Sequence, residues 1–211
     1  MSRSTATRHT RHMAIAVACT LVVSISGCAS SSDLSSLHDA VNAVLSAPNF
    51  TLVTTTFDPQ GTVVDEVVVE RPDRLSSDET INGTAKSDVV AIGSRGYIQG
   101  GSGQWTSIRH TRESTNLTNS VLIYLRLLDM TTAVTRQGNT YVVPTDEAVR
   151  LSASIRLVEA RSPSRVSLSA TVRAGLLRSV TLRIAGGSPA SVTTTVGRVG
   201  NSPRIKPPIG T

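Results

Sequence analysis

The sequence predicts an α+β domain in which a long, curved antiparallel β-sheet carries two or three helices on one face. Most of the chain consists of short segments rich in Val and Thr, in which apolar and polar residues alternate between turns of Gly, Pro, Asn and Asp, as in strands with one buried face. A few stretches instead repeat their apolar residues at helical spacing. The 211 residues are 39% hydrophobic and 17% charged, which is too apolar for a disordered chain and suits a single domain.

The first 28 residues are typical of a lipoprotein export signal. Three Arg and no acid precede an apolar run over residues 13–23, and Ile25-Ser26-Gly27-Cys28 follows it. This tetrapeptide resembles the bacterial lipobox, whose Cys receives diacylglycerol before cleavage. The alternative is an ordinary secretory signal, which also has small residues at its cleavage site. We therefore expect a signal peptide (1–27), the acylated Cys28 with a short linker (28–33), a folded domain (34–200) and a Pro-rich, frayed tail (201–211).

Cleavage at this site has three consequences for the mature chain. It removes Cys19 and three Arg, which leaves 18 basic and 15 acidic residues and gives no reason to expect a nucleic-acid partner. It leaves Cys28 in a thioether, so no disulfide is possible and the core alone must hold the domain together. Two or three acyl chains, palmitate among them, should anchor the exported protein to the outer face of the cell membrane.

The first half of the mature chain predicts one helix and a meander of strands. From Asp33, the expected N-cap, apolar residues recur at helical spacing until Ala47-Pro48 ends the pattern. A hairpin follows, with strands over residues 50–57 and 62–70 around the turn Asp58-Pro59-Gln60-Gly61. Shorter strands, separated by Gly-containing turns, are predicted over residues 74–81, 88–92 and 97–99, with Trp105 just beyond them.

The second half begins with the most apolar helix and ends in the clearest strands. Residues 117–130 have apolar residues on two sides of a helix, which predicts a helix covered on more than one side. A hairpin and a short helix that starts at Thr145 come next. Apolar and polar residues then alternate in predicted strands over residues 165–173, 179–184 and 191–199.

The sequence offers no recognisable catalytic or metal-binding motif. His38 and His110 are the histidines of the mature chain, and with no free Cys they cannot form a usual zinc site or a Cys-His pair. Gly-x-Ser-x-Gly and Walker motifs are absent, and Gly101-Ser102-Gly103 is best interpreted as a loop. Asp65 and Glu66 should point to opposite faces of a strand, so they are not an acid and base pair. We therefore predict a protein that is not an enzyme and needs no metal or cofactor.

The inner positions of the predicted sheet are Val, Leu, Ile, Ala and Thr, with few aromatic rings to fill a core. Under an apolar helix such a surface encloses either a hydrophobic cavity or a dry, fully packed core. Composition alone leaves both possibilities open.

The order of these features resembles a known family. After the lipobox, the helix and the hairpin come Val69-Glu70-Arg71-Pro72-Asp73-Arg74-Leu75, then Ile92-Gly93-Ser94-Arg95-Gly96-Tyr97-Ile98 and Trp105, and later the hairpin around Ala174-Gly175. The chain resembles the LppX and LprG lipoproteins of mycobacteria and related actinobacteria. This resemblance implies a half-barrel like those of the LolA carrier and the RseB sensor, with the helices on its concave face. It also implies a cavity that binds lipids or glycolipids with several acyl chains for transfer across the envelope, and no catalytic residues.

We accordingly expect a membrane-anchored envelope lipoprotein that binds acyl chains and takes part in their transfer or localisation. Its partners would be the membrane through acylated Cys28, a lipid or glycolipid, and an envelope transporter or other membrane protein. The alternative is a sensor or protein-binding accessory lipoprotein without cargo, in which arginines meet anionic headgroups or an acidic protein: Arg95, Arg109, Arg112, Arg165, Arg173 and Arg183. The expected cavity residues are Leu122, Ile123, Leu127, Val166, Leu168, Val180 and Leu182.

Overall fold

The computed structural model describes residues 31–99, 103–109, 122–154, 165–186 and 189–208. The described strands form one 11-stranded antiparallel sheet in the order β6-β5-β4-β3-β2-β1-β11-β10-β9-β8-β7, so the first and last strands pair at its centre. The elements are, in chain order, α1 (Ser31–Leu45), β1 (Asn49–Asp58), β2 (Gly61–Glu70), β3 (Arg74–Ile81), β4 (Thr84–Ile92), β5 (Arg95–Gln99), β6 (Trp105–Arg109), α3 (Ile123–Asp129), β7 (Thr135–Gln137), β8 (Thr140–Val143), α4 (Thr145–Ser154), β9 (Arg165–Arg173), β10 (Leu176–Ala185) and β11 (Ala190–Gly197).

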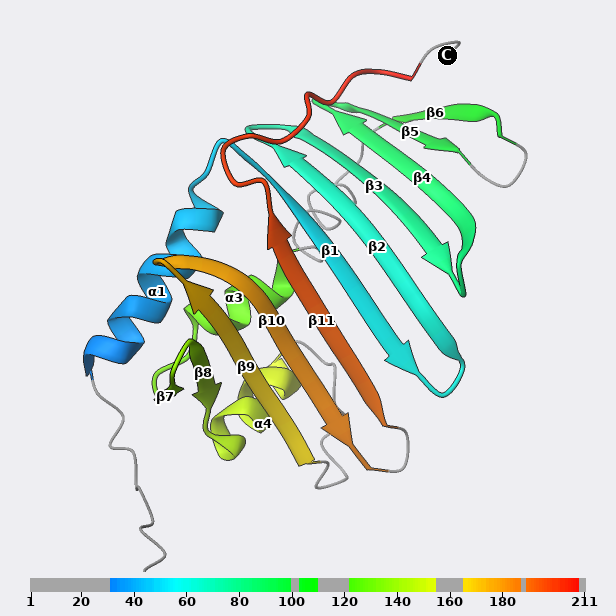
Figure 1. Cartoon of the computed structure of the whole chain (residues 1–211). Helices are drawn as coiled ribbons and strands as arrows, with labels where there is room; N and C mark the ends of the chain where they lie inside the picture. Colours follow the sequence, from blue (N-terminus) through cyan, green and yellow to red (C-terminus); the bar gives the residue numbers. More distant parts are fainter. Residues whose placement is uncertain (1–30, 100–102, 110–121, 155–164, 187–188, 209–211) are drawn as a thin grey trace, which may run out of the picture.

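The sheet is open and curved, and the helices lie on its concave side. In Figure 1, α3 and α4 lie behind the strands β8 to β11. Helix α1 packs against β10 and α3, while α4 packs against β9. The prediction of an α+β half-barrel with helices on the concave face is confirmed.

Strand register separates a buried concave face from a polar convex face. Across the strand pair β9 and β10, Leu168 lies opposite Leu182 and Ala170 opposite Val180, and all four side chains are buried. Their neighbours in the strands, such as Arg183, face the other way, because successive side chains of a strand alternate between faces. The same alternation places Asp65 on the concave face, opposite Thr54, and Glu66 on the convex face, opposite Val53. The two carboxylates therefore point to opposite faces, as expected.

Several element boundaries differ from the prediction. Helix α1 begins at Ser31, so Asp33 lies in its first turn and is not the N-cap. Strand β4 starts at Thr84, four residues earlier than expected, and Trp105 begins the unpredicted strand β6. Helix α3 begins at Ile123, and the earlier part of the helix predicted over residues 117–130 lies mainly outside the described residues.

Residues 201–208 of the C-terminal tail are held by contacts with the sheet, so the expectation that the tail frays was wrong for this segment. Ile205 is only 5% exposed, its backbone N–H donates to Glu70 Oε2 at 3.0 Å, and Arg74 donates to its carbonyl oxygen at 2.9 Å. The backbone N–H of Ser202 also donates to Asn49 Oδ1 at 2.7 Å. Figure 1 shows this segment crossing the ends of the central strands. These partners come from the start of β1 and from the β2–β3 turn, which are far away in sequence. They provide hydrogen bonds for backbone groups of the tail that belong to no helix or strand.

Candidate functional site

The structure brings the predicted cavity residues together in one apolar core between the helices and β8 to β11. This core also includes Leu37 and Val41 of α1 and Leu151 of α4. Ile123 is the exception, since it is half-buried and does not belong to the cluster. The others are nearly inaccessible: Leu122 3%, Leu127 1%, Val166 2%, Leu168 0%, Val180 1% and Leu182 1% exposed. In the form described here, these six side chains are therefore surrounded by protein atoms.

This core is mainly aliphatic. The rings within the core cluster are Phe50 and Tyr141, and its remaining side chains are Leu, Val and Ala. The buried Thr194 lies opposite Thr54 on the concave face, and their hydroxyl oxygens are 3.0 Å apart, so each satisfies the other. A surface of this kind contacts hydrocarbon without presenting unpaired polar atoms.

The concave face of β1 to β6 carries two cross-strand rows that become less buried toward the sheet edge. One row runs through Leu52, Val67, Ser77, Val89 and Ile98, and its exposure rises from 0% at Leu52 and 1% at Val67 to 37% at Ile98. With strands about 4.8 Å apart, this row is about 19 Å long. We call these two rows the concave rows.

The second concave row ends at Ile108, which is 43% exposed. It runs from buried Phe50 through Val69, Leu75, Ala91 and Gly96 to Ile108. A Cβ at Gly96 would lie 2.9 Å from Ile108 Cγ1, so the missing side chain gives Ile108 room to lie over the backbone of β5. The sequence interpretation missed both exposed isoleucines as candidate ligand contacts, because β6 was not recognised and their shared face depends on the pairing of β5 with β6.

Polar contacts hold the segment after α3 to α1 and α4. His38 Nε2 of α1 lies 3.1 Å from the Thr131 carbonyl oxygen. Glu147 of α4 accepts hydrogen bonds at Oε1 from the backbone N–H and the hydroxyl of Thr132. Burial by itself favours the neutral Glu147, but the hydrogen bonds from Thr132 and Thr131 and the nearby Arg150 charge outweigh it and lower the pKa of Glu147. The carboxylate is therefore ionised and holds the C-terminal end of α3 in place.

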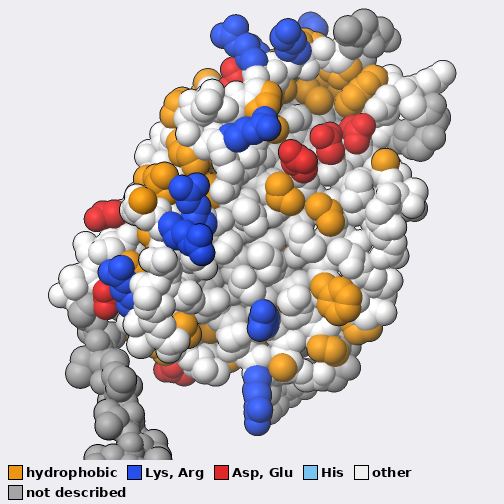
Figure 2. All heavy atoms as spheres, in the orientation of Figure 1, with side chains coloured by type: hydrophobic (Ala, Val, Ile, Leu, Met, Phe, Trp, Pro, Cys, Tyr) orange, Lys and Arg blue, Asp and Glu red, His pale blue; other side chains and the backbone are white. Residues whose placement is uncertain are grey.

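The convex face of β2 to β4 carries three carboxylates in one cross-strand row. Glu66 lies opposite Asp78, which lies opposite Asp88, and Figure 2 shows three acidic side chains side by side on this face. Burial, followed by the charges of Asp88, Glu66 and Asp65, raises the pKa of Asp78. Among the residues that the structure describes, no group of three or more His, Cys, Asp or Glu is placed to hold a metal ion.

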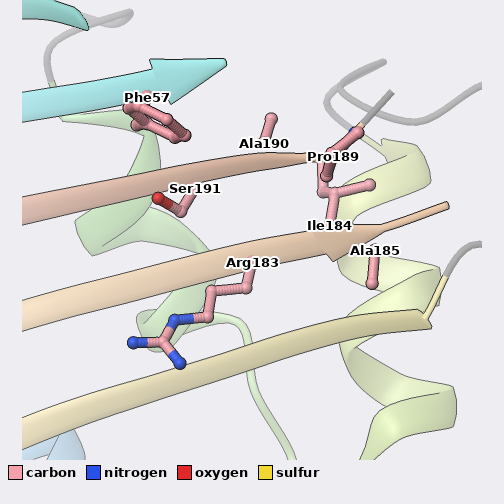
Figure 3. A pocket seen from close by; sticks show the side chains of 7 residues that line it. All are labelled: Phe57, Arg183, Ile184, Ala185, Pro189, Ala190 and Ser191. Carbon is pink, nitrogen blue, oxygen red and sulfur yellow. The ribbon is translucent and has the colours of Figure 1, made fainter. Parts of the chain in front are cut away.

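A shallow apolar pocket of about 220 Å³ lies where β1, β10 and β11 meet at one end of the sheet. Its lining includes Phe57, which is 58% exposed, together with Ile184, Pro189 and the aliphatic part of Arg183 (Figure 3). A second, polar groove of about 320 Å³ lies beside Glu147 and Arg150 of α4. Neither opening is lined by the predicted cavity residues.

Other residues singled out in the sequence are dispersed. Arg95, Arg165, Arg173 and Arg183 are exposed at separate places on the sheet, and Arg109 ends β6. Cys28, His110 and Arg112 lie outside the described residues. No helix within the described ranges is long and apolar enough to cross a bilayer.

Comparison with solved structures shows that the fold is shared with mycobacterial lipoproteins. The crystal structure of LprF from Mycobacterium bovis matches over 87% of this chain and 100% of its own, with a TM-score of 0.59 and 14% sequence identity. The lipoprotein LppX from Mycobacterium tuberculosis matches over 84% of this chain and 100% of its own, with a TM-score of 0.54 and 15% identity. No protein-family model matches the chain. No curated protein sequence matches it either.

Proposed function

We propose that this chain, whose fold is that of the mycobacterial lipoproteins LprF and LppX, is an exported lipoprotein that binds acyl chains on its concave face. In this proposal the acylated Cys28 anchors it to the outer face of the cell membrane. The bound lipid or glycolipid is transferred or localised within the envelope, and the protein catalyses no reaction. An envelope transporter or another membrane protein would then receive or supply the lipid.

The observation that carries the proposal is the gradient of burial along the concave rows. Isolated exposed apolar residues are common on protein surfaces, but Ile98 and Ile108 are neighbours on paired strands and lie at the end of continuous rows that lead into the core. An acyl chain that binds at Ile98 and Ile108 lies at the outer end of rows whose remaining members are mainly apolar, with Ser77 as the polar member of the first row. Each methylene it buries contributes about 0.8 kcal/mol.

The predicted cavity residues give the acyl chain a second, deeper site in this proposal. Leu122, Ile123 and Leu127, in α3 and the residue before it, would be its lid, and Leu168 of β9 and Leu182 of β10 would be its walls. Apart from the half-buried Ile123 these side chains are buried, so an acyl chain enters there only when α3 moves away from the sheet. The concave rows then serve as the entrance and the space beneath α3 as the interior.

Mass spectrometry on the protein purified from an actinobacterial host tests lipid binding. Native spectra followed by organic extraction should show lipid bound near one to one and identify it. The double variant Ile98→Gln with Ile108→Gln should lose lipid, whereas Val90→Gln, on the convex side of β4, should retain it. Leu168→Trp, which fills the space beneath α3, should lower the stoichiometry in a folded protein. Empty wild-type protein, or unchanged stoichiometry in folded variants, would contradict the proposal.

The anchor is tested separately by removing Cys28 together with the export signal. We expect the wild-type protein in the membrane fraction and residues 29–211, exported behind an ordinary cleavable signal peptide, in the soluble fraction, because the acyl chains supply the stable attachment. If the exported 29–211 protein stays with the membrane to the same extent as wild type, Cys28 is not the anchor.

A second candidate function, binding to a protein partner without cargo, is favoured by Phe57. An aromatic ring 58% exposed beside an apolar pocket is typical of an interface hot spot. Cross-linking at the membrane should then capture one stoichiometric partner that Phe57→Ala loses, while Val53→Ala, on the same face of β1, retains it. Absence of such a partner, with lipid present, leaves the lipid-binding function.

A further inference from the structure

We propose that one end of the sheet, the anchor-side rim formed by Arg136, Arg173, Leu176 and Arg178, docks on anionic phospholipid headgroups. The proposal deepens the membrane attachment through Cys28 and rests on it for the orientation of the domain. It adds a membrane-contacting surface within the folded domain.

The first step is the position of the anchor relative to the sheet. Cys28 is three residues before Ser31, where α1 begins, so the lipid is attached within about 11 Å of that helix end. In the first turn of α1, Asp33 Oδ1 lies 3.8 Å from Arg136 NH1 of β7. The start of α1 is thereby held at the β7 edge of the sheet, as Figure 1 also shows.

The second step links this edge to the β9–β10 turn. Arg136 Nε donates to the Gly138 carbonyl oxygen at 2.8 Å, and the backbone N–H of Val172 donates to the Asn139 carbonyl oxygen at 2.9 Å. The β7–β8 turn and the end of β9 are therefore in contact. Arg173 follows Val172 directly and lies opposite Leu176 across the β9–β10 turn.

The third step is the charge and exposure of the rim. Arg173 and Arg178 are exposed, the side chain of Arg136 is 46% exposed, and Leu176 is 37% exposed. Of the five Arg in β7 to β10, Arg136, Arg173 and Arg178 lie at this rim, where Arg136 pairs with Asp33 of α1, and the other two lie at the opposite end of β9 and β10. Figure 2 shows basic side chains on the side of the molecule that carries α1 and the β9–β10 turn.

These features match the chemistry of an anionic bilayer surface. Arginine guanidinium groups form paired hydrogen bonds with phosphate, and an exposed Leu between two cations inserts among the headgroups. Since the anchor holds the domain within a few residues of the lipid, the rim meets the surface at a high effective concentration. Docking there turns the opposite sheet end, which carries Phe57, away from the membrane.

The test measures binding to vesicles without the anchor. Residues 29–211, which lack both the apolar export signal and Cys28, are sedimented with vesicles of phosphatidylcholine alone or with 30% phosphatidylglycerol. We expect binding to the anionic vesicles that decreases with added salt. Arg173→Gln with Arg178→Gln should weaken it about 25-fold, at about five-fold per Arg. The matched control is Arg165→Gln with Arg183→Gln, which removes the same charge from the other end of the same two strands and should change binding little.

Equal losses in the two double variants would overturn the proposal, because binding would then follow net charge and not the rim. Equal binding to neutral and anionic vesicles, or no binding to either, would also overturn it. The protein in this test carries no acylated Cys28, and bound lipid is measured separately by mass spectrometry. A negative result for vesicle binding by the rim is therefore distinguishable from a negative result for the Cys28 anchor or for acyl-chain binding.

Discussion

Replacing Leu168 by Ala tests whether the space beneath the helices is closed in the lipid-free protein. Leu168 is 0% exposed and lies opposite Leu182 on one side and Val143 on the other, both buried. Removing three carbons from such a site loses their transfer free energy and leaves a cavity, which together cost about 3–5 kcal/mol. For a domain of this size, each kcal/mol lowers the Tm by about 2–4 °C, so we expect a decrease of about 6–20 °C.

The assay is urea and thermal unfolding of delipidated protein, with Ile98→Ala as the control. Ile98 is 37% exposed, so its truncation should cost less than about 1 kcal/mol. If Leu168→Ala also costs less than about 1 kcal/mol, Leu168 does not pack against protein on all sides. The closed-core interpretation would then be refuted, and the space beneath α3 would already be open without lipid.

Three further changes test individual contacts. The pKa of Glu147 is lowered in the folded protein, so the ionised carboxylate stabilises the fold. This stabilisation is complete above the unfolded-state pKa of about 4.3 and is lost as the pH falls through the lower folded-state pKa. The stability difference between wild type and Glu147→Gln, measured by urea unfolding, should therefore shrink in acid. The raised pKa of Asp78 has the opposite sign: Asp78→Asn should be more stable than wild type at pH 7, and this gain should vanish as the pH falls below about 4. Gly96→Ala places a methyl group 2.9 Å from Ile108 Cγ1 and should cost about 1 kcal/mol, and a double-mutant cycle with Ile108→Ala should show that the second change relieves this cost.

The parts of the fold that the sequence predicted well are those in which local pattern and tertiary environment agree. In β9 and β10 apolar and polar residues alternate strictly. The observed register places Leu168 opposite Leu182, so the apolar residues of both strands share one buried face. The helix α1 was found because Leu37, Val41 and Val44 recur on one side and Pro48 stops the chain beyond it. Resemblance to a family supplied the half-barrel form and the placement of the helices on its concave face, which the spacing of apolar residues alone does not indicate.

The parts that were missed depend on contacts between residues distant in sequence. The Pro-rich tail looks like a frayed end, but Glu70 and Arg74 bind the backbone of Ile205, more than 130 positions later. Strand β6 is too polar to be recognised alone, and it is defined by its pairing with β5. The concave rows become visible only when the register aligns residues of six strands. Most of the candidate entrance for lipid could therefore not be predicted from pattern. The pattern did identify buried residues of the apolar core, such as Leu127, Leu168 and Leu182, and their role in binding lipid stays a prediction.

The two parts of the concave face make different demands on a ligand. Moving α3 away from the sheet exposes Leu125, Leu127 and Leu128, and burying each Leu is worth about 1.5–3 kcal/mol, so opening costs about 5–9 kcal/mol. At about 0.8 kcal/mol per methylene, some 6–11 buried methylenes offset this cost. The outer ends of the concave rows require no opening, because Ile98 and Ile108 are 37% and 43% exposed, whereas inner members such as Leu52 and Val67 are buried. Under the proposed function we therefore expect a short acyl chain to gain only the outer ends of the rows and a long one to gain the space beneath α3 as well, so that lipids would be selected by chain length.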